Sequence, residues 1–72
     1  MNIPEEFLCP LTLDIMKNPV VSKQGLTFEY AAIAEWLDIY NDSCPLTREE
    51  LDLPDLTPGK DLKRRIKEWV DN

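Results

Sequence analysis

Hydrophobic residues between positions 30 and 40 recur at helical intervals. Ile33, Trp36, Leu37 and Tyr40 stand at relative positions i, i+3, i+4 and i+7, with polar and small residues between them. This spacing places one apolar stripe along a helix and leaves the opposite face to solvent. The pattern therefore predicts an amphipathic helix over residues 30–40.

A second helical stripe lies near the C-terminus. Thr57 and Pro58 stand just before it. Threonine is a favourable N-cap residue and proline suits the first helical position, so we expect the last helix to begin at Thr57-Pro58. The apolar positions that we expect this helix to bury are Leu62, Ile66, Trp69 and Val70.

Residues 20–28, which precede the first predicted helix, predict a small β-hairpin. Residues 20–22 and 26–28 are rich in β-branched and aromatic side chains, which favour strands. Gly25 lies between them and can adopt the positive φ that a tight turn requires.

Residues 1–19 and 44–56 predict two ordered loops. Pro4, Pro10 and Pro19 prevent a continuous helix in the first of them. We expect the apolar residues of both loops to pack on the later elements. In the first loop these are Phe7, Leu8, Leu11, Leu13, Ile15 and Met16, and in the second Leu46, Leu51, Leu53 and Leu56. The expected fold class is therefore α+β, with residues 1–72 forming one domain.

The cysteine content argues against a zinc site. The chain has two cysteines and no histidine, whereas a structural zinc site needs four Cys or His ligands, usually in close pairs. Without histidine there is no ordinary general base for a cysteine nucleophile, and no Cys-x-x-Cys redox pair occurs. We expect two reduced thiols and a cytoplasmic or nuclear setting, or the cytosol of a host cell if the source is an intracellular bacterium. A disulfide between Cys9 and Cys44 in an oxidising compartment is the alternative.

Charge narrows the choice of partner. The net charge is −6, from 14 acidic and 8 basic residues. Nucleic-acid binding requires a basic footprint, so this balance argues against it. No apolar run is long enough to cross a membrane, and we expect no membrane partner. An acidic chain favours a protein partner with a basic face.

One tetrapeptide occurs twice: Cys9-Pro10-Leu11-Thr12 returns as Cys44-Pro45-Leu46-Thr47. The two copies bracket the predicted helix. Together with a wider set of short motifs, they resemble the U-box domain of ubiquitin ligases. The other motifs are Ile3-Pro4, Phe7-Leu8, Met16-Lys17-Asn18-Pro19-Val20, Gly25-Leu26-Thr27-Phe28-Glu29, Trp36-Leu37, Leu56-Thr57-Pro58 and Ile66-Lys67-Glu68-Trp69.

The resemblance implies a RING-like fold in which hydrogen bonds and salt bridges replace zinc, with no cofactor. It also implies a ubiquitin transferase that acts as an adaptor. Such a domain recruits a ubiquitin-conjugating enzyme charged with ubiquitin and promotes transfer to a substrate lysine, without a covalent intermediate of its own. The substrate would be bound by a region outside this chain, and a homodimer is left open. The alternative is a degenerate U-box that serves only as a protein-interaction or dimerisation scaffold.

The resemblance also assigns roles to particular residues. It implies that the conjugating enzyme binds an apolar surface formed by two loops and a helix face. Each of these residues has the alternative of packing in the core, most of all Trp36, because a helical tryptophan is usually buried. The expected contact residues are Pro10, Leu11, Trp36, Pro45 and Leu46.

Arg48 follows the second Cys-Pro-Leu-Thr motif directly. The resemblance implies that it is a clamp that hydrogen-bonds both the conjugating enzyme and the ubiquitin. A guanidinium suits this task because it presents five donors in a plane and stays charged. The alternative is an internal ion pair with Glu29, Glu49 or Glu50.

Three positions depart from the pattern of the family. Asn18 stands where the family commonly has aspartate, Tyr30 where it has a basic residue, and Gly59 where it has asparagine. Missing members of a polar network leave groups unsatisfied, so we expect a modestly stable domain.

Overall fold

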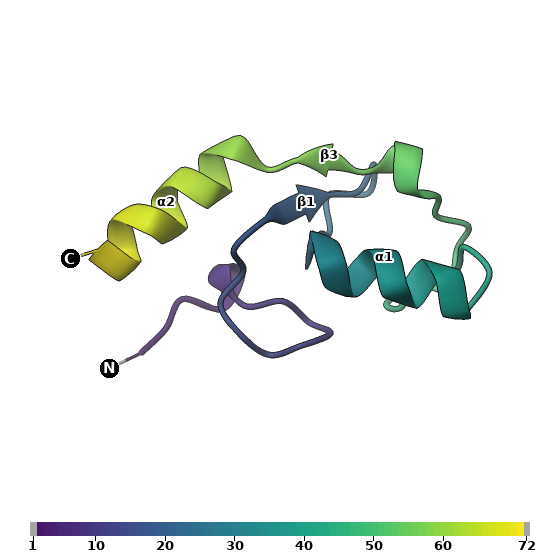
Figure 1. The fold of residues 1–72 in the computed structure, drawn as a ribbon, viewed down its shortest axis with the longest axis horizontal. Coiled ribbons are helices and arrows are strands. Elements are labelled where there is room, and N and C mark those ends of the chain that lie inside the picture. Colours follow the sequence, from purple (N-terminus) through teal and green to yellow (C-terminus); the bar gives the residue numbers. More distant parts are fainter. Residues whose placement is uncertain (1, 72) are drawn as a thin grey trace.

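The structure is a computed structural model and describes residues 2–71. Three short strands lie between two α-helices, which sit at opposite ends of an elongated molecule (Figure 1). The elements in chain order are a 3-10 helix η1 (Glu5–Phe7), β1 (Pro19–Val21), β2 (Thr27–Glu29), α1 (Tyr30–Ile39), a 3-10 helix η2 (Leu53–Asp55), β3 (Thr57–Pro58) and α2 (Lys60–Asp71). This architecture confirms the expected α+β class.

The sheet has the order β2-β1-β3, and both pairings are antiparallel. β1 and β2 form the predicted hairpin, in which Val20 lies opposite Phe28. Its turn is closed by a 2.9 Å hydrogen bond from the Gly25 N–H to the Ser22 carbonyl. Gly25 has a φ of 84°, which confirms the expectation that this turn needs a glycine.

The expectation that Thr57-Pro58 begins the last helix is wrong. These two residues form β3, with Thr57 opposite Val21 and Pro58 opposite Val20. The Thr57 hydroxyl donates a 3.2 Å hydrogen bond to the Val21 carbonyl instead of capping a helix. Pairing with a strand far away in the sequence overrides the local capping preference of Thr-Pro.

The last helix, α2, begins at Lys60, and Gly59 alone separates it from β3. The Gly59 N–H donates a 2.8 Å hydrogen bond to the Pro19 carbonyl and so ends the strand pairing. The Gly59 carbonyl then accepts the Lys63 N–H at 2.9 Å, the first helical hydrogen bond of α2. A Cβ at this position would lie 3.3 Å from Cγ2 of Val21, so glycine permits the close approach of strand and helix.

The core runs through both loops, the sheet and one face of each helix. Its buried members are Phe7, Cys9, Met16, Val20, Phe28, Ile33, Leu37, Cys44, Leu51, Leu62 and Ile66. Leu11, Ile15, Trp36, Leu56 and Trp69 pack against this core while remaining partly exposed. Of the residues in the two predicted helical stripes, Ile33, Leu37, Leu62 and Ile66 are buried, Trp36 and Trp69 are half-buried, and Tyr40 and Val70 are exposed.

Four apolar residues that were expected to pack inside are exposed. Leu13, whose backbone is left-handed with a φ of 61°, is 75% exposed, and Val70, in the last turn of α2, is 56% exposed while its neighbour Trp69 packs on Phe7. Leu46 and Leu53 also project from the second loop. The hydrophobic patterns of the helices and loops did not distinguish apolar side chains that enter the core from those that stay exposed.

Within residues 2–71, no helix is both long and apolar enough to cross a membrane.

Candidate functional site

The two Cys-Pro-Leu-Thr motifs form turns with the same hydrogen bonds. In each turn the cysteine carbonyl accepts the N–H of the residue four positions later, which is Leu13 for Cys9 and Arg48 for Cys44, both at 2.8 Å. The cysteine N–H in turn donates to the carbonyl five positions later, at 3.0 Å in the first turn and 2.8 Å in the second. The repeated sequence is therefore a repeated structure.

The threonine of each motif completes its turn. The Thr12 hydroxyl accepts the Asp14 N–H at 3.2 Å, and the Thr47 hydroxyl accepts the Glu49 N–H at 3.2 Å. Hydroxyl side chains that bond the backbone two residues on are typical of tight turns. Both loops are thus fixed internally before any partner binds.

Both cysteines are buried free thiols that accept backbone hydrogen bonds. The Sγ of Cys9 accepts the N–H groups of Leu11 at 3.4 Å and Glu29 at 3.3 Å. Burial pushes the pKa of the Cys44 thiol up, but hydrogen bonds from the hydroxyl and N–H of Thr47 and from the N–H of Leu46 outweigh it and leave this pKa below its ordinary value. The sulfur atoms act as internal acceptors that shape the loops. Among residues 2–71, no three Cys, His, Asp or Glu side chains gather in a way that could hold a metal ion.

Glu29 ties the first loop to the start of α1. Its carboxylate accepts the N–H of Lys17 at 2.8 Å and the N–H of Asn18 at 3.0 Å. A carboxylate acceptor makes such bonds stronger than neutral ones. Glu29 thus holds the segment that follows the first turn at a fixed distance from the helix.

Trp36 ties the second loop to the same helix. Its indole N–H donates a 2.8 Å hydrogen bond to the Ser43 carbonyl, one residue before the second turn. The ring also packs on Tyr40, with ring centroids 4.1 Å apart and planes inclined at 32°. Trp36 is half-buried, so it packs on the core and also reaches the surface.

Two adjoining pockets flank the Trp36–Tyr40 pair. One, of about 320 Å³, lies between α1 and the first loop and includes Leu11 and Ile39. The other, of about 300 Å³, lies between α1 and the second loop and includes Pro45 and Arg48. The structure therefore brings four of the predicted residues to one surface: Leu11, Trp36, Pro45 and Arg48.

The remaining predicted residues lie beside these pockets. Pro10 and Leu46 are exposed in their loops and line neither pocket. Ile39, which is 60% exposed, was missed by the sequence reasoning, as was the role of Tyr40 as a wall of both pockets. Ile39 carries a signal that could have found it, because it is a large apolar residue outside the helical stripe. We call the surface formed by these pockets and the exposed loop residues beside them the recruiting face, after the role that the resemblance implies for its predicted members; it comprises Pro10, Leu11, Leu13, Trp36, Ile39, Tyr40, Pro45, Leu46 and Arg48.

Arg48 is exposed at the rim of the second pocket. Within residues 2–71, no salt bridge joins it to a carboxylate. Glu49 instead accepts a hydrogen bond from the Gln24 side chain, and Glu29 is occupied by backbone N–H groups. The guanidinium is therefore not held by any of the carboxylates that were considered as internal partners.

The departures from the family pattern lie away from this surface. The Asn18 side-chain oxygen accepts a 3.1 Å hydrogen bond from the Lys63 ammonium, which links the first loop to α2. Tyr30, at the first position of α1, is 49% exposed. Neither residue is buried without a partner, since no buried side-chain N or O within residues 2–71 lacks a hydrogen bond.

Comparison with known proteins places the chain in a family. The sequence model of the U-box domain matches residues 3–72, so the chain belongs to the U-box family.

The chain is also similar to individual proteins of this family. It is 43% identical over 70 residues to E3 ubiquitin-protein ligase PUB22 of Arabidopsis thaliana, covering 96% of this chain and 16% of that protein. It is 42% identical over 69 residues to U-box domain-containing protein 10 of Arabidopsis thaliana, covering 96% of this chain and 11% of that protein. It is 37% identical over 71 residues to E3 ubiquitin-protein ligase SPL11 of Oryza sativa subsp. japonica, covering 99% of this chain and 10% of that protein. The chain thus spans less than a fifth of the length of these relatives.

Proposed function

We propose that this chain is a ubiquitin ligase module that recruits a ubiquitin-conjugating enzyme through the recruiting face. The observation that carries the proposal is the convergence of Leu11, Trp36, Pro45 and Arg48 on two adjoining pockets in a chain of the U-box family. The relatives named E3 ubiquitin-protein ligases support the activity. An exposed apolar surface of this kind marks a protein-binding site.

The reaction would be promoted by positioning. Both thiols are buried and accept internal hydrogen bonds, so neither is placed to form a thioester with ubiquitin. The nucleophile is the substrate lysine, and the bond that breaks is the thioester on the conjugating enzyme. The domain contributes by holding the charged enzyme in a reactive arrangement, which lowers the entropic part of the barrier.

Arg48 would supply the electrostatic part. Its guanidinium is exposed beside the second pocket and carries no internal salt bridge within residues 2–71. From this position it can donate to carbonyl or carboxylate groups of both the conjugating enzyme and its ubiquitin. Arginine suits this bridging role because its donors lie in a planar fork and its charge is permanent.

The two turns favour rapid and reversible binding. Each loop is closed by its own backbone and threonine hydrogen bonds, so little conformational freedom is lost when a partner docks. We expect a small interface, below roughly 1,200 Å², with the affinity of a transient complex. We further propose that substrates are held by a region outside these residues, and that the module acts in the cytoplasm or nucleus.

The decisive experiment is a discharge assay. The domain is mixed with a conjugating enzyme charged with ubiquitin and with free lysine, and loss of the thioester is followed over time. We expect the domain to accelerate discharge, Leu11→Ala to abolish the acceleration, and Leu53→Ala to preserve it. Leu53 is the matched control because it is an exposed leucine outside the recruiting face.

Two results would overturn the proposal. One is the absence of acceleration across a panel of conjugating enzymes, which would leave a scaffold without ligase activity. The other is equal acceleration by the wild-type and Leu11→Ala proteins, which would place the recruiting surface elsewhere. Circular dichroism of each variant separates both results from a failure to fold.

A further inference from the structure

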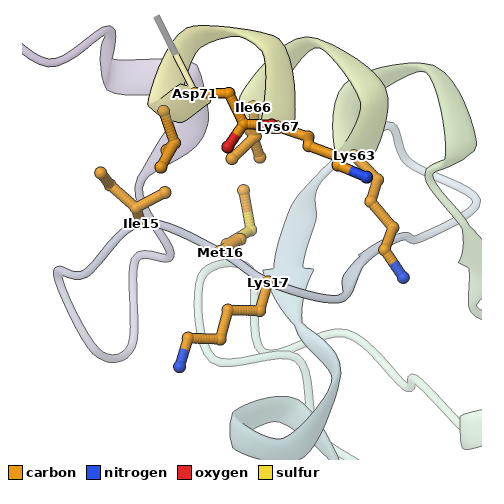
Figure 2. Close-up of a pocket in the computed structure, with 8 residues that line it drawn as sticks. Ile15, Met16, Lys17, Lys63, Ile66, Lys67 and Asp71 are labelled. Carbon is orange, nitrogen blue, oxygen red and sulfur yellow. The ribbon is translucent and has the colours of Figure 1, made fainter.

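A second groove shares no lining residue with the pockets of the recruiting face. It lies between the loop segment Ile15–Lys17 and α2, and its volume is about 430 Å³ (Figure 2). Its floor is apolar: Met16 and Ile66 belong to the core, and Ile15 packs against it. Val70, at 56% exposure, extends this floor to the surface. The groove therefore offers an apolar surface that the fold itself does not cover.

Lysines line this groove, although the chain is acidic overall. Lys17, Lys63 and Lys67 are among its lining residues in a chain of net charge −6, and the Lys17 side chain extends from the loop on the side away from α2 (Figure 2). Within residues 2–71, none of the three forms a salt bridge, whereas the ion pairs of the structure use other basic residues. The Lys63 ammonium donates a hydrogen bond to the neutral side-chain oxygen of Asn18. The groove thus presents positive charge that internal carboxylates do not neutralise.

One carboxylate marks the opposite end of the groove. Asp71 lies two helical turns beyond Lys63 on α2, about 12 Å along the axis at 1.5 Å per residue. Lys67 stands between them, one turn before Asp71, so three lysines face a single aspartate along the groove. An acidic ligand would place its carboxylates toward the lysines and its apolar side chains toward Val70, beside Asp71.

The backbone around the groove is already hydrogen-bonded. The Met16 N–H donates to the Phe7 carbonyl at 2.9 Å, and the Lys17 N–H donates to the Glu29 carboxylate at 2.8 Å. The other wall is the helix α2, whose backbone bonds itself. Because these two N–H groups are engaged and the other wall is a helix, recognition through side chains is favoured here, as when a helix packs into a groove.

We propose that this groove binds an acidic amphipathic helix of a partner protein. Apolar side chains of that helix cover Met16, Ile66 and Val70, and its carboxylates lie over Lys17 and Lys67. A second copy of this chain is a poorer occupant, because two chains of net charge −6 repel each other. The groove and the pockets of the recruiting face share no lining residue, so a ligand in one leaves the lining of the other uncovered. The proposal thus goes beyond the recruitment of a conjugating enzyme.

The test uses a synthetic peptide as the probe. The probe is a fluorescein-labelled helix of about 14 residues, with leucines at positions i, i+4, i+7 and i+11 and glutamates among the remaining positions. A scrambled peptide of the same composition removes the apolar stripe, and a third peptide replaces every glutamate by lysine. Fluorescence anisotropy measures affinity for the 72-residue chain, and amide chemical shifts of the isotope-labelled chain locate the binding site.

We expect saturable binding of the acidic amphipathic peptide only. The double variant Lys17→Glu/Lys67→Glu should weaken binding by about tenfold or more, and raising the salt concentration should weaken wild-type binding. The matched control is Lys60→Glu, which reverses a lysine on the same helix outside the groove. The double variant should discharge a charged conjugating enzyme at the wild-type rate, and Leu11→Ala should bind the peptide normally. Failure of one proposal is therefore distinguishable from failure of the other.

Several outcomes overturn the proposal. They are the absence of saturable binding, equal binding of the scrambled or the basic peptide, and shifts that map to Trp36 and Tyr40 instead of Ile66 and Val70. Concentration-dependent shifts at the groove without peptide would show that a second copy occupies it, which also contradicts a distinct partner. Thermal unfolding of each variant confirms that it is folded before its affinity is interpreted.

Discussion

Leu13 and Arg48 occupy equivalent positions in two turns of the same geometry, and both have a left-handed backbone. Their φ angles are 61° and 64°, and each N–H closes its turn on the cysteine four positions earlier. This conformation costs a non-glycine residue roughly 1–2 kcal/mol. Neither side chain repays that cost by packing, because Leu13 is 75% exposed and Arg48 is also exposed. The left-handed backbone thus belongs to the turn itself, while the side chains at these two positions are left free to contact a partner.

Replacing Arg48 by glycine should separate stability from activity. Glycine adopts a positive φ freely, so we expect Arg48→Gly to be as stable as the wild type or up to about 1 kcal/mol more stable. The same variant should slow ubiquitin discharge, because the guanidinium is gone. Urea unfolding and the discharge assay measure the two effects, and Arg48→Ala is the control that removes the guanidinium but keeps the strain. Loss of stability in Arg48→Gly would show that the guanidinium supports the fold.

Leu13 should behave in the same way in the first turn. Asparagine tolerates a left-handed backbone better than leucine, so Leu13→Asn should not lower the free energy of unfolding. It should weaken binding of the conjugating enzyme, because it removes an exposed apolar contact from the recruiting face. Leu53→Asn, an equally polar change at another exposed leucine, should leave this affinity unchanged. If both variants bind like the wild type, Leu13 is not part of the interface.

The sequence predicted those parts of the fold that depend on local pattern. Helical spacing predicted α1 and the buried positions Leu62 and Ile66, and Gly25 indicated the hairpin turn. The sequence-based prediction failed at residues 57–58, whose structure is determined by pairing with a distant strand. Thr57 pairs with Val21, 36 positions earlier, and a capping preference read from neighbouring residues contains no information about that pairing.

The candidate site was predictable for a different reason. The repeated tetrapeptide has the same local hydrogen bonds in both copies, so its geometry follows from its own residues. The spacing of Ile39 could have indicated an exposed apolar position, but its place beside Leu11 depends on how the first loop folds back onto α1. Nothing in the local sequence specifies that approach. The groove beside α2 was missed because its two walls are about 50 residues apart in the chain.

Trp36 should stabilise the second loop through one hydrogen bond. Trp36→Phe keeps an aromatic ring but loses the N–H that binds the Ser43 carbonyl. We expect the free energy of unfolding to fall by about 1–2 kcal/mol, from the lost hydrogen bond and some packing. Discharge should also slow, since the second turn follows Ser43 directly. Tyr40→Phe, which removes an exposed hydroxyl, should change stability by less than about 0.5 kcal/mol. An equal effect of both variants would show that the indole N–H contributes nothing.

Asn18 offers a test of the departure from the family pattern. Asn18→Asp would convert the Lys63–Asn18 hydrogen bond at 3.1 Å into a salt bridge. Both groups are exposed, so we expect a gain of no more than about 1 kcal/mol, and less at high salt. Urea unfolding at low and high ionic strength measures it, with Asn18→Ala as the control that removes the acceptor. A loss of stability in Asn18→Asp would indicate repulsion between the new carboxylate and that of Glu29, which accepts the Asn18 N–H.

The Asp42 carboxyl should make the stability of the folded chain depend on pH. A hydrogen bond to Asp52 raises the pKa of the Asp42 carboxyl above its ordinary 3.8, and partial desolvation and repulsion from Asp52 and Glu50 raise it further. The folded chain therefore holds this proton more tightly than the unfolded chain. The contribution of Asp42 to stability is fully present below pH 3.8, and it is lost as the pH rises through the folded pKa. At neutral pH the ionised pair repels and opposes folding.

Asp42→Asn should remove that repulsion. The amide can donate to the Asp52 carboxylate, and asparagine tolerates the φ of 60° at this position. We expect the melting temperature to rise at about pH 7, and the gain over the wild type to disappear near pH 3, where Asp42 is protonated. Thermal unfolding of both proteins across this range measures the difference, and Asp38→Asn on the exposed face of α1 controls for the loss of one negative charge. A gain that stays constant with pH would assign the effect to the backbone preference of asparagine and not to the Asp42–Asp52 pair.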